Sequence, residues 1–323
     1  MSRNLPGMNI SDVISQVWCH WSLVMGLLGN SFVLYSTVIN KAIRLDKLSV
    51  WIIQNLAIVD FLNTLFLLLP VIISLYSNNT WVLGDTFCRV FFVYKYVGFT
   101  ANMVLINALS LNKMVRCLAP LRSLGCSKTL HWVVTAITAA TAAITPAYSA
   151  YRTVVDDKFI VVFSASQCMC SSVQVSKAES WHKVVYYLIA GLLNGLPCVT
   201  LCVMNLFLVV YALRKSNRAV NKRNIVIVVL ITASFLLFGL PYFFYSTKHG
   251  QTSGDNDPVL RFVTFTTFIS FWSNPVIYLV TNQNFRSFTV QSARRFSRVA
   301  GNSTVHPVSY VANVNNEVVR SLK

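Results

Sequence analysis

The chain has 323 residues, of which 55% are hydrophobic and only 11% are charged, and its net charge is +17. A soluble domain carries about 25% charged residues, so this composition indicates a protein that needs lipid around it. The positive charge does not indicate a nucleic-acid-binding protein, because the basic residues lie mainly in short segments between apolar runs.

Seven apolar stretches are long enough to cross a bilayer, which takes roughly 20 mostly apolar residues. They are 17–39, 49–75, 89–111, 130–150, 184–213, 224–246 and 259–281. No internal repeat relates the first stretches to the later ones, as it does in many transporters. We therefore expect an all-α membrane protein, built as a seven-transmembrane helix bundle.

The segments between these stretches carry a strong charge bias. One set of loops, together with the tail after 281, holds eighteen basic residues and two acids, Asp46 and Glu317. The other set, with the adjoining span ends, holds nine basic residues and seven acids. Since loops rich in lysine and arginine stay in the cytoplasm, we expect an extracellular N-terminus, a cytoplasmic C-terminus and a multi-pass plasma-membrane protein.

Several short motifs follow one another along the stretches. In chain order they are Gly29-Asn30-x-x-Val33, "NLAIVD" ending at Asp60, "WVLGDTFC" with Trp81, Gly84 and Cys88, then Trp132, Pro197, and "NPVIY" from Asn274 to Tyr278 with Phe285 after it. In this order and on these spans they resemble the rhodopsin-like (class A) G-protein-coupled receptors over about residues 17–296. The resemblance implies a receptor for an extracellular ligand, with a heterotrimeric G protein and arrestin as intracellular partners.

On that resemblance the chain divides into three parts. They are an extracellular N-terminal tail at 1–16, a seven-transmembrane receptor domain at 17–283, and an amphipathic helix with a cytoplasmic tail at 284–323. In the last part three phenylalanines fall near one helical face, with arginines around them: Phe285, Phe288 and Phe296. This pattern suits a short helix on the lipid of an anionic inner leaflet, and a disordered basic tail is the alternative.

Asp60 lies near the middle of the second stretch, where an ionisable side chain is costly and by default functional. Its expected polar neighbours are Asn30, Asn102, Ser270 and Asn274, and the resemblance implies a water and sodium pocket among them. The alternative is a protonated aspartate in a hydrogen-bond network that packs helices. Beyond this sodium ion we expect no metal and no cofactor, because the eight cysteines lack zinc-site spacing.

Cys88 begins the third stretch on the outer side, and Cys168 and Cys170 lie in the second outer loop. A disulfide persists outside the cell, and the resemblance implies a bridge between these two places. We expect Cys88–Cys168, with Cys170 as the alternative partner, because sequence does not determine connectivity. Asn9, in Asn-Ile-Ser, is the expected glycosylation site on the outer tail.

The inner end of the third stretch departs from the family pattern. Asn112, Lys113 and Met114 stand where the family has an acid, an arginine and a tyrosine. Lysine keeps the positive charge but loses the planar fork of donors, and Asn112 has no carboxylate to hold it. Asn221, near the start of the sixth stretch, has none either. We therefore expect an inner face that lacks one ionic restraint, and measurable basal signalling.

Two further positions differ from the residues that the family uses to switch between inactive and active states. Gly239 takes the place of the tryptophan that the family keeps two residues before Pro241, and Asn205 stands where a tyrosine is frequent. Pro241 and Pro275 each remove a helical hydrogen bond, and the resemblance makes them activation hinges, with kinks that never move as the alternative. Tyr278 completes the motif on the G-protein side.

Lys95 follows Cys88 by seven residues, so it lies about 10 Å deeper on the same helical face. A lysine there favours an anionic group or a carbonyl, as a peptide would supply, over a cationic amine. The alternative is a lysine that snorkels outward or pairs with Asp156 or Asp157. Aromatic residues form the expected ligand walls: Tyr96, Phe99, Tyr242, Phe243 and Phe268.

The sequence shows no nucleophile–base pair, phosphate-binding loop or metal cluster, so we do not expect an enzyme. The first expectation is a receptor that activates a G protein. The alternative is a receptor-like protein that acts as a scavenger or pairs with another receptor without signalling, which Asn112, Lys113 and Gly239 motivate. A transporter or channel is a third class, disfavoured by the missing repeats.

Overall fold

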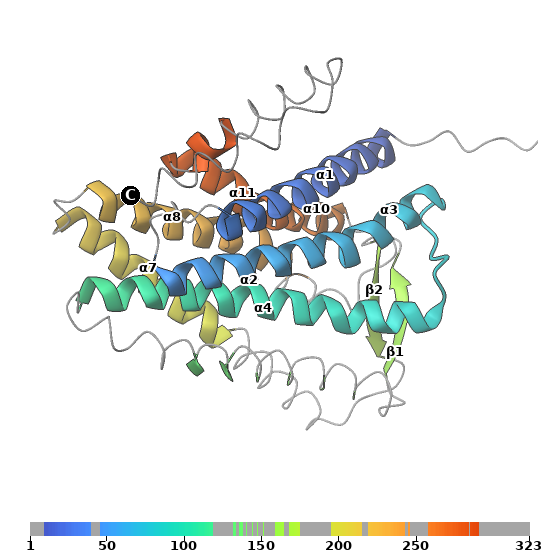
Figure 1. Cartoon of the computed structure of the whole chain (residues 1–323). Coiled ribbons are helices and arrows are strands. Elements are labelled where there is room, and N and C mark those ends of the chain that lie inside the picture. Colours follow the sequence, from blue (N-terminus) through green and yellow to red (C-terminus); the bar gives the residue numbers. More distant parts are fainter. Residues whose placement is uncertain are drawn as a thin grey trace, which may run out of the picture. The chain divides into compact units, whose positions relative to one another are not determined.

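The structure is a computed structural model of the chain (Figure 1). It describes residues 10–39, 46–118, 159–164, 168–174, 195–214, 219–242, 258–283 and 285–290, with single positions at 245 and between 132 and 151. The chain forms two compact units, Met1–Asn282 and Gln283–Lys323.

Six helical runs among the described residues could cross a membrane by length and composition. They are α1 (Ile10–Ile39), α2 (Lys47–Asn63) with η1 (Thr64–Leu68) and α3 (Leu69–Tyr76), α4 (Asp85–Leu118), α7 (Leu196–Arg214), α8 (Ala219–Ser234) with η3 (Phe235–Gly239), and α10 (Pro258–Thr267) with α11 (Ile269–Thr281). They correspond to six predicted stretches. The fourth stretch, 130–150, lies mostly outside the described residues, and its described positions are all helical.

The helices bury some polar residues among apolar ones and expose many large apolar residues on the outer face of the bundle. On α1, Asn30 is fully buried, whereas Leu28 and Val38 are both 67% exposed. The Asn30 amide donates to the carbonyls of Gly26 and Phe271, each at 2.8 Å. A polar group removed from water needs such partners, and an exposed leucine needs none when lipid surrounds it.

Contacts between the helices close a ring in the first unit. Helix α1 contacts α2 and α11, α2 contacts α4, α4 contacts α7, and α7 and α11 both contact α8. Figure 1 shows α2 and α4 running side by side. At Gly29 a Cβ atom would lie 2.9 Å from the Pro275 ring, so glycine allows α1 and α11 to approach closely.

Two π-helical turns interrupt the spans, η1 within the second and η3 within the sixth. Each comes just before a proline, Pro70 and Pro241, whose missing N–H disturbs the regular ladder of helical hydrogen bonds. Such turns occur frequently at functional sites. The sequence predicted a bend at Pro241 but not its π-helical form.

A two-stranded hairpin lies outside the spans, an addition to the predicted all-α fold. Strands β1 (Phe159–Ser164) and β2 (Met169–Gln174) pair antiparallel, with Phe163 opposite Cys170. Both strands contact α4, and Figure 1 shows the hairpin beside the start of that helix.

In the second unit, residues 285–290 are helical, and the Thr289 hydroxyl donates to the Phe285 carbonyl at 2.8 Å. Phe296 lies outside the described residues. The amphipathic character of this segment and the predicted domain boundaries therefore stay predictions.

Candidate functional site

A small cavity lies inside the bundle, and its lining includes Met169 of the hairpin and Asn102, which contacts Asp60. Its lining is mainly apolar and aromatic: Leu67, Lys95, Tyr96, Phe99, Asn102, Met169, Phe235, Tyr242, Thr264, Thr267, Phe268, Ser270 and Phe271. Five of the six predicted ligand residues are in this set, whereas Phe243 lies outside the described residues. The cavity volume is about 40 Å³, room for about three waters at roughly 10–15 Å³ each.

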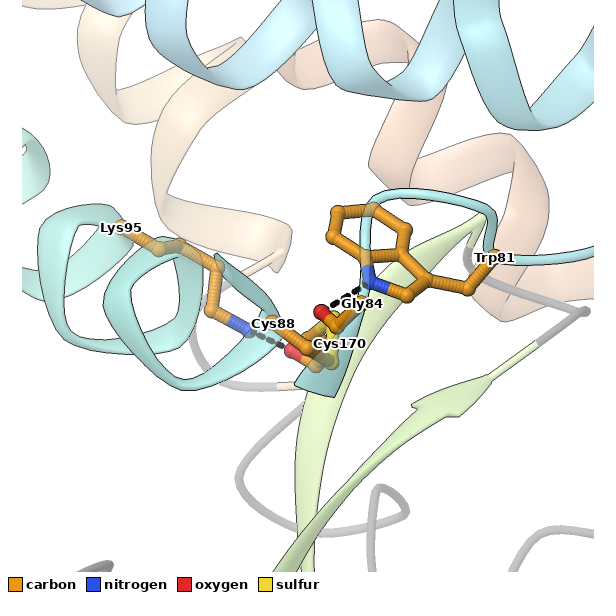
Figure 2. The surroundings of a disulfide bond; sticks show 5 residues. All are labelled: Trp81, Gly84, Cys88, Lys95 and Cys170. Atoms are coloured by element: carbon orange, nitrogen blue, oxygen red, sulfur yellow. Dashed lines mark hydrogen bonds between the residues drawn. A yellow bond between two sulfur atoms is a disulfide. The ribbon is translucent and has the colours of Figure 1, made fainter. Parts of the chain in front are cut away.

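Lys95 points into this cavity. Its ammonium donates to the Cys170 carbonyl at 3.3 Å, as Figure 2 shows. It also lies 5.3 Å from the Phe92 ring centroid and 5.6 Å from those of Tyr96 and Tyr242. Aromatic faces attract a cation, but none of these groups is an anion. The side chain is therefore buried and turned inward rather than snorkelling, and Asp156 and Asp157 lie outside the described residues.

The predicted disulfide partner is wrong, because Cys88 bonds to Cys170 and not to Cys168. Cys170 lies within β2, where successive side chains alternate between the two faces. Cys168 lies in the preceding turn with φ +51°, outside that alternation. Its buried thiol lies 3.6 Å from the Asn79 side-chain oxygen. Burial raises the pKa of Cys168 to about 11, despite the opposing effect of Arg261.

The loop before α4 sets the position of this disulfide. The Trp81 indole donates to the Gly84 carbonyl at 2.9 Å (Figure 2). The same carbonyl accepts from the Cys88 amide at 3.1 Å. Gly84 has φ +80°, a conformation that favours glycine. The Trp81 ring stacks on Phe163 of β1, with the ring centroids 5.5 Å apart. The loop and the hairpin are thus packed together at the mouth of the cavity.

Asp60 is fully buried beneath the cavity and accepts two amide hydrogen bonds. Asn102 and Asn274 donate to its two carboxylate oxygens, each at 2.7 Å. The structure thus brings together three of the five residues predicted for the polar pocket. Asn30 donates to backbone carbonyls instead, and the Ser270 hydroxyl donates to Thr267 at 2.7 Å.

Two oxygen groups near Asp60 would suit a monovalent cation as ligands. Hard cations take oxygen ligands, and the Asn102 side-chain oxygen is buried without a hydrogen-bond partner among the described residues. It and the Asp60 carboxylate would hold a sodium ion, whose charge would neutralise the aspartate without a proton. The described residues contain no group of three or more His, Cys, Asp or Glu that could hold a metal ion.

At the other end of α4, Lys113 is held by an acid that the sequence did not identify as its partner. Its ammonium lies 3.0 Å from the carboxylate of Asp46, and Arg116 lies 3.2 Å from the same group. The Asn112 amide donates to Asp46 at 2.8 Å and to the Ser49 hydroxyl at 2.9 Å. The expectation considered only positions 112 and 221 as sources of an ionic restraint, and Asp46 supplies one that it did not foresee. We call these five residues the Asp46 latch.

Asp46 is also the N-cap of α2, where its side chain accepts from the Ser49 amide at 2.9 Å. Burial by itself would raise the pKa of Asp46. The positive charge of Lys113 and the hydrogen bonds from Asn112, Lys113 and Ser49 outweigh it and hold the pKa well below the usual range. An N-cap with a serine three positions later is a readable signal for a helix start, but it does not reveal a partner on α4.

The remaining predicted switch residues pack against or hydrogen-bond to neighbouring helices. The Phe235 and Phe99 rings approach to 5.2 Å between centroids beside Gly239. Asn205 donates to the Ser110 hydroxyl on α4 at 3.2 Å. The other predicted switch residues are spread along the bundle: Met114 is partly buried, Pro241 exposed, and Pro275 and Tyr278 buried in α11. Residues that the sequence did not single out are Asp46 and Ser49 as latch residues, and six in the cavity lining: Leu67, Met169, Phe235, Thr264, Thr267 and Phe271.

Comparisons with known proteins agree on one family. The family described as 7 transmembrane receptor (rhodopsin family) matches residues 29–278. The cysteinyl leukotriene receptor 1 of Mus musculus is 25% identical over 278 residues, which cover 81% of this chain and 76% of that receptor. The C5a anaphylatoxin chemotactic receptor 1 of Homo sapiens is 23% identical over 294 residues, which cover 86% of this chain and 79% of that receptor.

A solved structure of squid rhodopsin is similar in fold. It superimposes with a TM-score of 0.69 at 16% sequence identity, covering 92% of this chain and 89% of that one. The predicted seven-transmembrane helix bundle is therefore confirmed.

Proposed function

We propose that the chain, which belongs to the rhodopsin family of seven-transmembrane receptors, transmits the binding of an extracellular ligand to an intracellular heterotrimeric G protein. Its relatives are receptors and not enzymes, and six described helices are suited to a membrane.

One observation supports this function above the others. Helix α4 carries Lys95 in the cavity and Lys113 in the Asp46 latch. The two lysines are eighteen positions apart, which is about 27 Å of helix at about 1.5 Å per residue. A ligand that displaces Lys95 from the Cys170 carbonyl therefore acts on α4, the same helix that carries Lys113 of the Asp46 latch at the opposite end of the bundle. Small shifts of a packed helix are an established way to couple distant sites.

We propose an anionic group on the ligand. Lys95 is a buried cation whose described neighbours are a carbonyl and three aromatic rings, so a carboxylate would be its first anionic partner there. Aromatic walls around a few placed polar groups are typical of small-molecule sites. The relatives are named for a cysteinyl leukotriene and for the C5a anaphylatoxin. These names include both a lipid and a protein ligand, and a carboxylate is available in either.

We propose that the disulfide end of the bundle faces outside the cell and the Asp46 latch faces inside. The charge bias of the loops supports this, and so does the disulfide, which persists in an extracellular environment. Epitope tags at the two termini, stained in intact and in permeabilised cells, test the orientation. An N-terminal tag that stains only after permeabilisation in surface-expressed protein contradicts this orientation. Peptide mapping tests the glycosylation of Asn9.

The test of function separates binding from coupling. A library of acidic lipids and peptides is screened by thermal stabilisation of the purified chain, which needs no G protein. Each compound that binds is then assayed for nucleotide exchange on a panel of heterotrimeric G proteins and for arrestin recruitment. Ligand-driven exchange supports the proposal, and binding without exchange on any G protein contradicts it.

The second candidate is a receptor-shaped protein that takes up ligand or pairs with another receptor. Two observations favour it: Gly239 replaces the bulky switch residue, and the Asp46 latch already occupies Lys113. Uptake of a bound ligand into cells without nucleotide exchange is its expected signature.

A further inference from the structure

We infer that Arg223, near the start of α8, restrains the sixth span by binding the C-terminal end of α11, and so adds a second contact to the Asp46 latch at this end of the bundle. The inference rests on the proposed function in one respect, that this end is where a G protein acts.

The Asp46 latch does not reach the sixth span. It joins the start of α2 to the last part of α4, and none of its five residues belongs to α8. Asn221, near the start of the sixth span, has no carboxylate with which to pair a cation of α4. If the inner end of the sixth span is held, a different contact must hold it.

That contact is a hydrogen bond between α8 and the residue that ends α11. The Arg223 guanidinium donates to the Asn282 side-chain oxygen at 3.0 Å, although 59 positions separate the two residues. Asn282 is the C-cap of α11 and is buried, and Arg223 is half-buried. At the other end of α8, the Ser234 hydroxyl donates to the Ser273 hydroxyl of α11 at 2.7 Å. Hydrogen bonds therefore join the two helices near both ends of α8.

The partial charges of the helix ends explain why an arginine serves here. Arg223 lies near the N-terminal end of α8, which carries a partial positive charge, so its own helix does not stabilise it. The C-terminal end of α11 carries a partial negative charge and has no basic residue in its last turn. Arg223 supplies that positive charge from the neighbouring helix. Both the hydrogen bond and this helix-end attraction are lost if α8 separates from α11.

The acceptor that Arg223 uses is uncharged. Arg223 has no acidic partner among the residues that the structure describes. A hydrogen bond between two ionised groups is stronger than one in which the acceptor is a neutral amide. Asn282 therefore provides a restraint that can be released more easily than an ion pair. Changing the amide to a carboxylate should strengthen this restraint without adding bulk.

The tether is tested first by hydrogen exchange of the purified full chain in lipid nanodiscs, without ligand or G protein. Arg223→Gln should make the backbone amides near the start of α8 exchange about tenfold faster. That factor corresponds to about 1.4 kcal/mol, close to the least that a hydrogen bond to a charged group contributes. Arg214→Gln removes an exposed arginine at the end of α7 and is the control. Unchanged hydrogen exchange near the start of α8, or an equal change in the control, would overturn the inference.

The second test reverses the sign of one substitution. Asn282→Asp should raise the thermal midpoint and slow hydrogen exchange near the start of α8, because Arg223 then pairs with a carboxylate. In the Arg223→Gln background, the same change should lower the thermal midpoint, because the new carboxylate faces the negative end of α11 without a cation. A residue that only capped α11 would not show this reversal. A shift of the same sign in both backgrounds would overturn the inference.

A separate measurement connects the tether to signalling. At matched surface density, Arg223→Gln should raise basal nucleotide exchange and Asn282→Asp should lower it. The expected changes in hydrogen exchange, together with no nucleotide exchange on any G protein, would contradict the proposed signalling and leave the tether standing. Ligand-driven nucleotide exchange by the wild type, together with hydrogen exchange that Arg223→Gln does not change, would do the opposite.

Discussion

The Lys113 ammonium lies 3.0 Å from the Asp46 carboxylate, although 67 positions separate the two residues in the chain. Asp46 caps the start of α2, and Lys113 lies near the end of α4. Lys113 is buried and Asp46 mostly so. The pair fastens two helices together at the end of the bundle where we place the G protein.

Asp46→Asn is expected to raise basal nucleotide exchange and to lower the thermal midpoint. Asparagine keeps the size of the side chain but leaves the Lys113 cation without its anion, and removing one partner of a buried pair costs about 3–5 kcal/mol. Both quantities are measured at matched surface density. Asp85→Asn removes an exposed acid at the opposite end of α4 and is the control. A basal rate equal to that of the control would show that the pair does not restrain the inactive state.

The same pair is not expected to respond to pH near neutrality. The pKa of Asp46 is held below its ordinary value, so its stabilising effect is present above the unfolded carboxyl pKa of about 3.9 and is lost as the pH falls through the lower folded value. The thermal midpoint difference between wild type and Asp46→Asn should therefore stay constant through the neutral range. If the difference in thermal midpoint disappeared on mild acidification, the pKa of Asp46 would not be lowered in the folded protein.

Asn112→Asp is expected to weaken the latch. From the sequence alone this change restores the family's acid and should lower basal signalling. In the structure the Asn112 amide donates to Asp46 at 2.8 Å, so a carboxylate there would face another carboxylate. Like charges at this distance repel. Basal exchange should rise rather than fall, with Asn112→Gln, which keeps the amide, as the comparison. A lower basal rate would show that the attraction between the new aspartate and Lys113 outweighs its repulsion from Asp46.

Cys170→Ala is expected to lose surface expression, whereas Cys168→Ala is expected to keep it. Only Cys170 joins the hairpin to Cys88 on α4. Cys168 is buried as a thiol with its pKa raised to about 11, and the thiolate is the reactive form. Non-reducing peptide mapping should recover the Cys88–Cys170 pair, and Cys168 should resist alkylation until the protein is denatured. Recovery of a Cys88–Cys168 peptide would reverse the assignment.

Lys95→Met is expected to weaken the binding of an acidic ligand by about 2–5 kcal/mol, because it removes one partner of a buried charge pair. The measurement compares an acid found in the binding screen with its methyl ester, on wild type and variant. Wild type should prefer the acid, and Lys95→Met should bind the two alike. Lys95→Arg keeps the charge without the compact ammonium and serves as the control. An unchanged preference for the acid would place the anion elsewhere.

Asp60→Asn is expected to abolish any stabilisation that depends on sodium. The wild-type chain should melt at a higher temperature in sodium chloride than in choline chloride of equal ionic strength, because Asp60 and the Asn102 oxygen offer ligands to the ion. The variant should show no such difference. Equal midpoints in the two salts for wild type would leave Asp60 as a hydrogen-bond acceptor between α4 and α11.

What the sequence determined by itself are the features governed by local composition and helical spacing. The apolar stretches predicted the spans, because a bilayer of fixed thickness demands a minimum apolar length and hydrogen-bonded helices. The spacing from Cys88 to Lys95 predicted the depth of the lysine, because a helix rises by a constant amount per residue. Five residues of the cavity lining and the Asp60–Asn274 neighbourhood followed from this geometry and from the family motifs.

What the tertiary structure decided are the pairings across the bundle. Cys170 rather than Cys168 meets Cys88, because the backbone conformation at 168 turns one cysteine away. Asp46 rather than Asn112 supplies the charge that holds Lys113, because α2 packs on α4 in a register that spacing along either helix does not reveal. The Phe235 and Phe99 rings lie together beside Gly239, a contact between two helices that spacing along the chain does not reveal. Each of these contacts depends on how separate helices pack against one another, and that arrangement exists only once the chain has folded.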